Sequence, residues 1–258
     1  MNVVPKKAYG QHFLADDNIL RVIERLAGLE TDDVVLEIGP GLGVLTRFLA
    51  DRVAHVHAVE VDRTLEPRLR QELGERSSVD LVFGDALRLD LAALDPVPRK
   101  LVANLPYNVA TPIVVESLDG LPMLRQWCVM VQREVADRFF AEPRTKAYGA
   151  VSVLLQLATE RTGFHPVART VFRPPPNVDS ALVAFRRREL PADYPQLKRL
   201  VEAAFAYRRK TLPNSLELAG AASRAEAAEA LEALGRPAAT RAEELAPGAY
   251  PQLLAALR

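Results

Sequence analysis

The stretch VVLEIGPGLG, residues 34–43, decides the fold of this chain. Its first half is a short apolar, β-branched run, which is typical of a buried parallel strand. Glycines follow at positions 39, 41 and 43, and residues 44–52 (VLTRFLADR) then carry apolar side chains at helical spacing. Strand, glycine-rich turn and helix open a Rossmann-like unit, in which glycine lets the backbone come close to a ligand. The stretch therefore predicts an α/β fold with a ligand bound at the turn.

Two acidic residues indicate an adenosine ligand. The predicted second strand, HVHAVEVD (residues 55–62), places Glu60 at its carboxyl end, about 20 residues beyond the turn, where a carboxylate can accept both hydroxyls of a ribose. The predicted third strand, VDLVF (residues 79–83), is followed by Gly84 and Asp85. Asp85 lies where a carboxylate can accept the adenine amino group.

The turn favours S-adenosylmethionine over a dinucleotide. In the dinucleotide fingerprint G-x-G-x-x-G, the third glycine would fall on Val44. Glu37, two residues before the first glycine, would repel a pyrophosphate but could interact with a sulfonium or an amino group. The alternatives are a turn that only packs a helix on a strand, and acidic residues that are simply solvated.

The tetrapeptide NLPY, residues 104–107, suits a flat heterocycle. It follows the apolar run KLVA, so it lies where a buried strand ends. Tyr107 offers a stacking face, Asn104 and nearby backbone carbonyls offer acceptors for an exocyclic amino group, and Pro106 stiffens the turn. Asn-x-Pro is also ordinary turn chemistry, so the tetrapeptide alone leaves both interpretations open.

Together these motifs make the chain resemble the ribosomal RNA adenine dimethyltransferases over nearly its whole length. Within that group it is most similar to the small-subunit (16S) enzymes, the KsgA/RsmA family, because of the segment FAYRRKTLPNSL (residues 205–216). The segments that carry the resemblance are GQHFL (10–14), EIGPGLG (37–43), AVEVD (58–62), GDAL (84–87), NLPYNVATPI (104–113) and FRPPPNVDS (172–180).

The resemblance implies two sets of site residues. The cofactor set is His12, Leu14, Gly39, Glu60, Asp85 and Asn104. The catalytic set, around the target adenine, is Asn104, Leu105, Pro106, Tyr107 and Phe172, with Tyr107 and Phe172 sandwiching the base. His12 could instead be a solvated residue of the N-terminal arm, and Phe172 could belong to the core.

The expected chemistry needs positioning rather than acid–base groups or a metal. Hydrogen bonds from the adenine N6 protons to the Asn104 side chain and the Leu105 carbonyl would localise the nitrogen lone pair. Alignment of two reactants can contribute roughly 7–11 kcal/mol. The sequence predicts no metal, since it has one cysteine (Cys128) and four scattered histidines. The target base must leave its stack, which costs a few kcal/mol.

Composition limits the class of protein. The chain has 258 residues, of which 49% are hydrophobic, and no apolar run is long enough for a membrane span. The first residues lack a secretory signal and there is one cysteine, so we expect a cytoplasmic protein. Its 33 basic and 33 acidic residues balance, but RNA could bind to local basic clusters. These clusters are residues 6–7, 186–188, 198–199 and 208–210.

The chain is expected to form two domains. Residues 1–190, with an arm over 1–16, would form the class I S-adenosylmethionine-dependent methyltransferase domain, whose seven-stranded, mostly parallel sheet is implied by the resemblance. Residues 191–258 would form a small helical domain that docks on RNA or the ribosomal subunit. The pattern further predicts a helix over 18–27 and capping boxes that start at Ser223 and Thr240.

The leading hypothesis is a monomeric enzyme that dimethylates two adjacent adenines in the 3′-terminal hairpin of 16S rRNA, using S-adenosylmethionine and acting on the assembling small subunit. The first alternative keeps the chemistry but moves it to large-subunit rRNA. The second is a ribosome-assembly factor whose role is mainly binding.

Overall fold

The computed structural model describes residues 12–14 and 16–258, which divide into two compact units. The first unit extends to Ala136 and resumes over Arg161–Arg187. The second unit contains Asp137–Glu160 and Arg188–Arg258. The predicted boundary at residue 190 lies close to Arg188, but the second unit also takes in the segment 137–160.

Contacts of Tyr148 explain why that segment joins the C-terminal helices. Its hydroxyl donates to the Leu245 carbonyl at 2.7 Å, and its backbone carbonyl accepts from the Arg208 guanidinium at 3.1 Å. Its ring also lies edge-on to that of Phe205, with centroids 5.9 Å apart. These long-range partners are not visible in the local sequence pattern.

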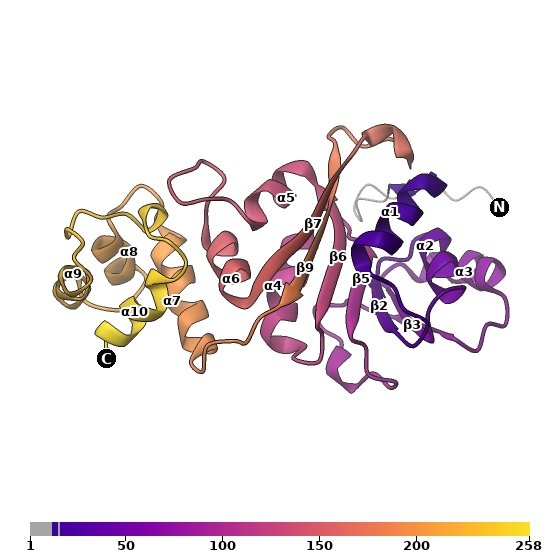
Figure 1. Cartoon of the computed structure of the whole chain (residues 1–258), viewed down its shortest axis with the longest axis horizontal. Coiled ribbons are helices and arrows are strands. Elements are labelled where there is room, and N and C mark those ends of the chain that lie inside the picture. Colours follow the sequence, from indigo (N-terminus) through magenta and orange to yellow (C-terminus); the bar gives the residue numbers. More distant parts are fainter. Residues whose placement is uncertain (1–11, 15) are drawn as a thin grey trace. The chain divides into compact units, whose positions relative to one another are not determined.

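A seven-stranded sheet forms the centre of the first unit, in the order β4-β3-β2-β5-β6-β9-β7 (Figure 1). Neighbouring strands from β4 to β6 are parallel, and β9 is antiparallel to β6, which confirms the predicted mostly parallel sheet. The strands are β2 (Val34–Ile38), β3 (His55–Glu60), β4 (Val79–Phe83), β5 (Lys100–Asn104), β6 (Gln126–Gln132), β7 (Thr159–Val167) and β9 (Ser180–Arg187).

The first helix shows how local signals set its ends. In α1 (Asp17–Ala27) the Asp16 side chain accepts from the Asn18 N–H at the start, and Gly28 ends the helix with a φ of 51°. The helix packs against β5, β6 and β9. Its buried side chains join those of the strands in one apolar core. The other helices of this unit are α2 (Val44–Ala50), α3 (Glu66–Leu73) and α4 (Ala110–Gly120), while α5 (Arg133–Phe139) crosses the division at Ala136.

A short second sheet joins the N-terminal arm to the segment after β7. Strand β1 (Phe13–Leu14) pairs antiparallel with β8 (Phe172–Arg173), so that Leu14 lies opposite Phe172. Residues about 160 positions apart in the sequence therefore meet, and the Phe13 ring lies against Gly41 of the glycine-rich turn.

Helices account for most of the second unit. At α9, Ser223 accepts from the Glu226 N–H and Glu226 accepts from the Ser223 N–H, which confirms the first predicted capping box. The helices are α6 (Ala150–Ala158), α7 (Tyr194–Ala206), α8 (Leu212–Leu218), α9 (Arg224–Ala233) and α10 (Ala249–Ala256). Among the described residues, no helix is both long enough and apolar enough to cross a membrane.

Candidate active site

A cavity of about 290 Å³ lies where the parallel strands β2, β3 and β5 end. Its walls come from the arm, the glycine-rich turn, the ends of β3 and β4, and the segment after β5. Every residue of the predicted cofactor set lines it: His12, Leu14, Gly39, Glu60, Asp85 and Asn104. Leu105, Pro106 and Tyr107 of the catalytic set line it as well.

The glycine-rich turn can pass close to its neighbours because positions 39 and 41 carry no side chain. Gly39 has a φ of 78°, and a Cβ added there would lie 3.2 Å from the ring of Pro106. Gly41 has a φ of 58°, and a Cβ there would lie 3.0 Å from the ring of Phe13. L-residues rarely adopt such positive φ values. The turn is thus packed directly against the NLPY loop and the arm.

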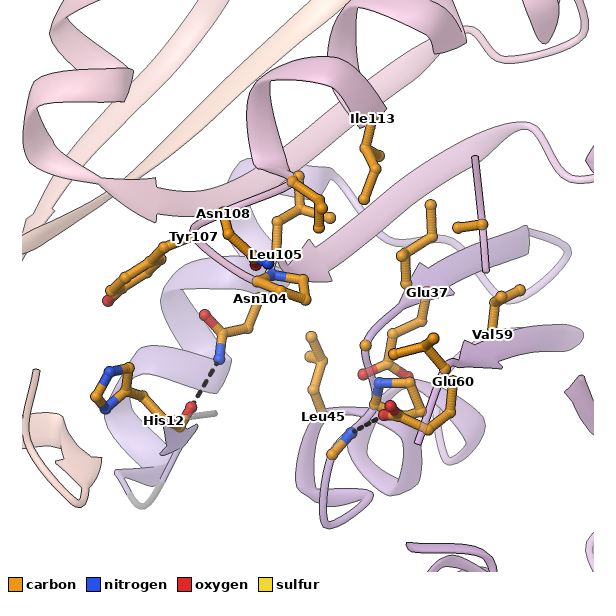
Figure 2. Close-up of a pocket in the computed structure, with 18 of the residues that line it drawn as sticks. His12, Glu37, Leu45, Val59, Glu60, Asn104, Leu105, Tyr107, Asn108 and Ile113 are labelled. Carbon is orange, nitrogen blue, oxygen red and sulfur yellow. Dashed lines mark hydrogen bonds between the residues drawn. The ribbon is translucent and has the colours of Figure 1, made fainter. Parts of the chain in front are cut away.

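Glu60 ties the end of β3 to this turn. Its side chain is buried, with 5% of the residue exposed. One carboxylate oxygen accepts from the Gly41 N–H at 3.1 Å (Figure 2). The other accepts from the Asp62 N–H at 2.9 Å. Burial raises the pKa of Glu60, and these two backbone N–H groups oppose that rise. The carboxylate is therefore held in one orientation at the cavity wall.

Glu37 is a second buried acid of the cavity, and its Oε2 makes no hydrogen bond. Complete burial raises its pKa to about 8. A buried carboxyl group with one oxygen that lacks a hydrogen bond either keeps a proton or needs a nearby cation. A cationic ligand would favour the ionised form of Glu37, so Glu37 and Glu60 together fit an adenosine ligand that carries positive charge, as S-adenosylmethionine does.

Asp85 differs from these two acids because its side chain is half exposed. Its Oδ1 accepts from the Leu87 N–H at 3.0 Å, and its Oδ2 lies 3.4 Å from Arg88 Nε. It lines the cavity, as predicted, at the end of β4. Its contact with an adenine amino group stays a prediction.

Asn104 lies opposite the acids, next to the arm. Its amide nitrogen donates to the His12 carbonyl at 3.2 Å, so the amide oxygen is the end of the side chain that remains for an amino group (Figure 2). The following Leu105 N–H donates to the Met130 carbonyl at 3.1 Å, which fixes the backbone of the loop to β6. The Asn104 amide oxygen and the Leu105 carbonyl can therefore serve as two fixed acceptors for an exocyclic amino group.

Tyr107 is partly buried and held from two directions. Its hydroxyl is 2.6 Å from Ser180 Oγ, and its ring centroid is 5.6 Å from that of His12. The His12 ring in turn bonds the Pro174 carbonyl through Nδ1 at 2.9 Å. The sequence analysis gave Ser180 no separate role, although it is the last residue of the FRPPPNVDS motif, and only the fold shows that it orients Tyr107.

Phe172 is the exception among the predicted site residues. It does not line the cavity and is fully buried. Its ring packs in the main apolar core, because β8 pairs with β1 and places Phe172 opposite Leu14. In this structure the apolar core accounts for Phe172, and its part in the predicted sandwich with Tyr107 stays a prediction.

The prediction that the histidines are scattered is wrong for two of them. In the described part of the chain, one group of side chains has the spacing of metal ligands, namely His55, His57 and Asp80. None of the three lines the cavity. Asp80 is 23 residues from His57 in the sequence, and only the parallel register of β3 and β4 brings the two side by side.

Comparison with known proteins agrees with the geometry. The sequence profile of the family described as ribosomal RNA adenine dimethylase matches residues 4–243. A protein of Rubrobacter xylanophilus, named ribosomal RNA small subunit methyltransferase A, is 51% identical over 244 residues, covering 94% of this chain and 91% of that protein. A protein of the same name from Thermobifida fusca is 44% identical and covers 95% and 88% of the two chains.

Two solved structures share the fold. A dimethyladenosine transferase from Plasmodium falciparum has a TM-score of 0.77 at 22% identity, with 94% of this chain and 96% of that chain covered. The 23S rRNA methyltransferase ErmE has a TM-score of 0.68 at 30% identity, with 95% and 99% covered.

The sheet order, the glycine-rich turn and the two buried acids define a class I methyltransferase that uses S-adenosylmethionine. Within that class, the chain belongs to the ribosomal RNA adenine dimethylase family, and in it to the small-subunit enzymes of the KsgA/RsmA group.

Proposed function

We propose that this enzyme dimethylates N6 of two adjacent adenines in the 3′-terminal hairpin of 16S rRNA, within the assembling small subunit. The observation that carries the proposal is the placement of Asn104, whose amide nitrogen is engaged by the His12 carbonyl, in one cavity with Glu60 and Tyr107. The name shared by the most similar relatives supports the small subunit as the substrate. We expect a cytoplasmic monomer.

The residues of the chain act by holding and aligning the two reactants. S-adenosylmethionine supplies an electrophilic methyl group on a sulfonium. Glu60 would accept the ribose hydroxyls, Asp85 the adenine amino group of the cofactor, and Glu37 faces the cavity as a group that favours positive charge. Leu14 and His12 of the arm would also contact the cofactor.

On the substrate side, Asn104 and Leu105 prepare the nucleophile. The Asn104 amide oxygen and the Leu105 carbonyl would accept the N6 protons, which localises the lone pair on the nitrogen. Pro106 keeps this loop against Gly39. Tyr107 stacks on the flipped base, which can contribute ~1–3 kcal/mol toward the cost of unstacking. The product is cationic and loses its proton to water, so no side chain has to act as a base.

The proposal is tested with purified enzyme, S-adenosylmethionine and unmethylated small ribosomal subunits, followed by mass spectrometry of the digested RNA. We expect N6,N6-dimethyladenosine in small-subunit RNA, and its loss with Asn104→Ala. Large-subunit particles run in parallel as the substrate control.

Dimethyladenosine in large-subunit RNA instead would move the assignment to enzymes that methylate 23S rRNA, as ErmE does. Absence of product in every particle, with subunit binding intact, would favour a protein whose role is mainly binding.

A further inference from the structure

A cluster of two histidines and an aspartate lies on the sheet away from the cavity. His55 and His57 are two positions apart on β3, so their side chains project from the same face. Asp80 on β4 lies directly opposite His57 in the parallel register. Strand β4 is at the edge of the sheet, so this cluster joins the edge strand to its neighbour.

The hydrogen bond of His57 Nε2 leaves Nδ1 as the ring nitrogen that is available to bind a ligand. Its Nε2 lies 2.7 Å from the carbonyl oxygen of Pro96, which can only accept, so Nε2 carries the hydrogen of this bond. Its Nδ1 makes no hydrogen bond, even though the residue is buried, with only 1% of it exposed. The atom that Nδ1 faces is Oδ2 of Asp80, at 3.4 Å. In a neutral imidazole, a lone pair would thus face a carboxylate oxygen unless a cation lies between them.

The three candidate ligand atoms are close enough to share one transition-metal ion, although Asp80 and His55 are hydrogen-bonded to each other in this structure. Asp80 Oδ2 lies 2.9 Å from His55 Nε2 and 3.4 Å from His57 Nδ1, and all three atoms are within 4.8 Å of one another. Zinc bonds to nitrogen and carboxylate oxygen are about 2.0–2.2 Å long, so neighbouring ligands of a tetrahedral site are roughly 3.3 Å apart. The Pro96 carbonyl corresponds to the backbone group that commonly orients a metal-bound histidine.

We propose that His55 Nε2, His57 Nδ1 and Asp80 Oδ2 bind one divalent transition-metal cation of the Zn²⁺ type. Imidazole and carboxylate ligands suit such cations, and Asp80 is half exposed, which leaves room for water as a further ligand. The bound cation links the edge strand β4 to β3 and keeps His57 against Pro96. Its role is structural: it stabilises the sheet edge.

The site is separate from the catalytic cavity. His57 precedes Glu60 by three residues on β3, so the two side chains project from opposite faces, about 10 Å apart along the strand. Metal binding is therefore measurable without cofactor, RNA or activity, and its outcome is independent of the proposed methylation.

The test uses the full chain without an affinity tag, stripped with a chelator and titrated with Zn²⁺ by calorimetry. We expect one Zn²⁺ per chain and a rise in melting temperature that Mg²⁺ does not reproduce. Asp80→Asn and His55→Gln should each weaken Zn²⁺ binding by at least about tenfold. His165→Gln, a histidine of β7 outside the cluster, is the matched control and should bind like the parent.

The rival explanation is a proton on Nδ1, which would make His57 an imidazolium paired with Asp80. Nitrogen NMR of the histidines distinguishes the two, because the proposal requires His57 Nδ1 to be unprotonated in the stripped chain at pH 8 and to shift when Zn²⁺ is added. A doubly protonated His57 at that pH, no Zn²⁺ binding, or binding unchanged in both cluster variants would overturn the proposal.

Discussion

The two sides of the cavity are built in different ways. Figure 2 shows Glu37 and Glu60 on one side, and His12, Asn104 and Tyr107 on the other. The acidic side comes from two neighbouring strands, and Glu60 is held by backbone N–H groups. The opposite side combines the arm, the end of β5 with the loop after it, and the start of β9, through contacts between residues far apart in the sequence.

This difference shows which side depends on long-range folding. The acidic side, with Glu37 and Glu60, is complete once β2 and β3 pair and the turn closes. The substrate side requires the arm to pair with β8 and Ser180 to meet Tyr107. Substitutions on the first side should therefore change cofactor affinity, while those on the second should change turnover or the stability of the arm.

Phe172 gives the largest expected effect. Because its ring is fully buried in the core, Phe172→Ala should lower the free energy of unfolding by about 3–5 kcal/mol. Urea unfolding followed by circular dichroism measures this loss. The control is Phe172→Leu, which keeps most of the apolar contact and should lose less. If Phe172→Ala left stability unchanged but abolished turnover, Phe172 would belong to the substrate side after all.

Glu60 comes next. In Glu60→Gln, the amide nitrogen must face one of the two N–H groups that the carboxylate now satisfies. Hydrogen bonds to a charged group are worth about 1.5–3 kcal/mol, so affinity for S-adenosylmethionine should fall roughly 10–150-fold. Calorimetry measures the affinity, and binding to small subunits without cofactor should stay as in the parent. A selective loss of subunit binding would contradict the assignment of Glu60 to the cofactor side.

Tyr107 separates stacking from hydrogen bonding. Tyr107→Ala removes the ring and the ~1–3 kcal/mol of stacking free energy. Turnover should therefore fall roughly 5–150-fold, with little change in cofactor affinity. Tyr107→Phe keeps the ring and loses only the hydrogen bond to Ser180. The activation free energy of methylation should therefore rise by only about 0.5–1.5 kcal/mol. Single-turnover methylation measures both variants. Equal losses in the two variants would show that the hydroxyl and not the stacking face is what matters.

The same contrast explains what the sequence could predict. Strand, glycine-rich turn and Glu60 follow from local pattern, and all the predicted cofactor residues line the cavity. The ends of α1 were also predictable, because Asp16 and Gly28 act on their immediate neighbours. These features depend on contacts within a few residues or between strands of regular register.

Features that depend on distant contacts were not predictable. The burial of Phe172 follows from the pairing of β8 with β1, and the place of residues 137–160 follows from the bonds of Tyr148. The predicted capping box at Thr240 is also wrong: Glu244, not Glu243, accepts from the backbone, and it does so from Arg241. The Thr240 N–H, which such a box would use, donates to the Pro237 carbonyl at 2.9 Å, and the Thr240 carbonyl accepts from the distant Leu212 N–H at 2.8 Å.

Glu37 tests the acidic side directly, through the pH dependence of stability. Burial raises the pKa of its carboxyl from 4.5 to about 8, so between these pH values the folded chain holds a proton that the unfolded chain has lost. Stability should therefore fall as pH rises through this window, by about 1.4 kcal/mol per pH unit, and this contribution should level off above pH 8. Glu37→Gln keeps a neutral side chain of similar size and should remove that slope, while the slopes of the other groups remain in both proteins. Urea unfolding of the parent and the variant at pH 6, 7 and 9 measures the difference. Parallel pH profiles would mean that Glu37 is ionised in the folded chain, and the acidic side would then carry a charge that some partner must already balance.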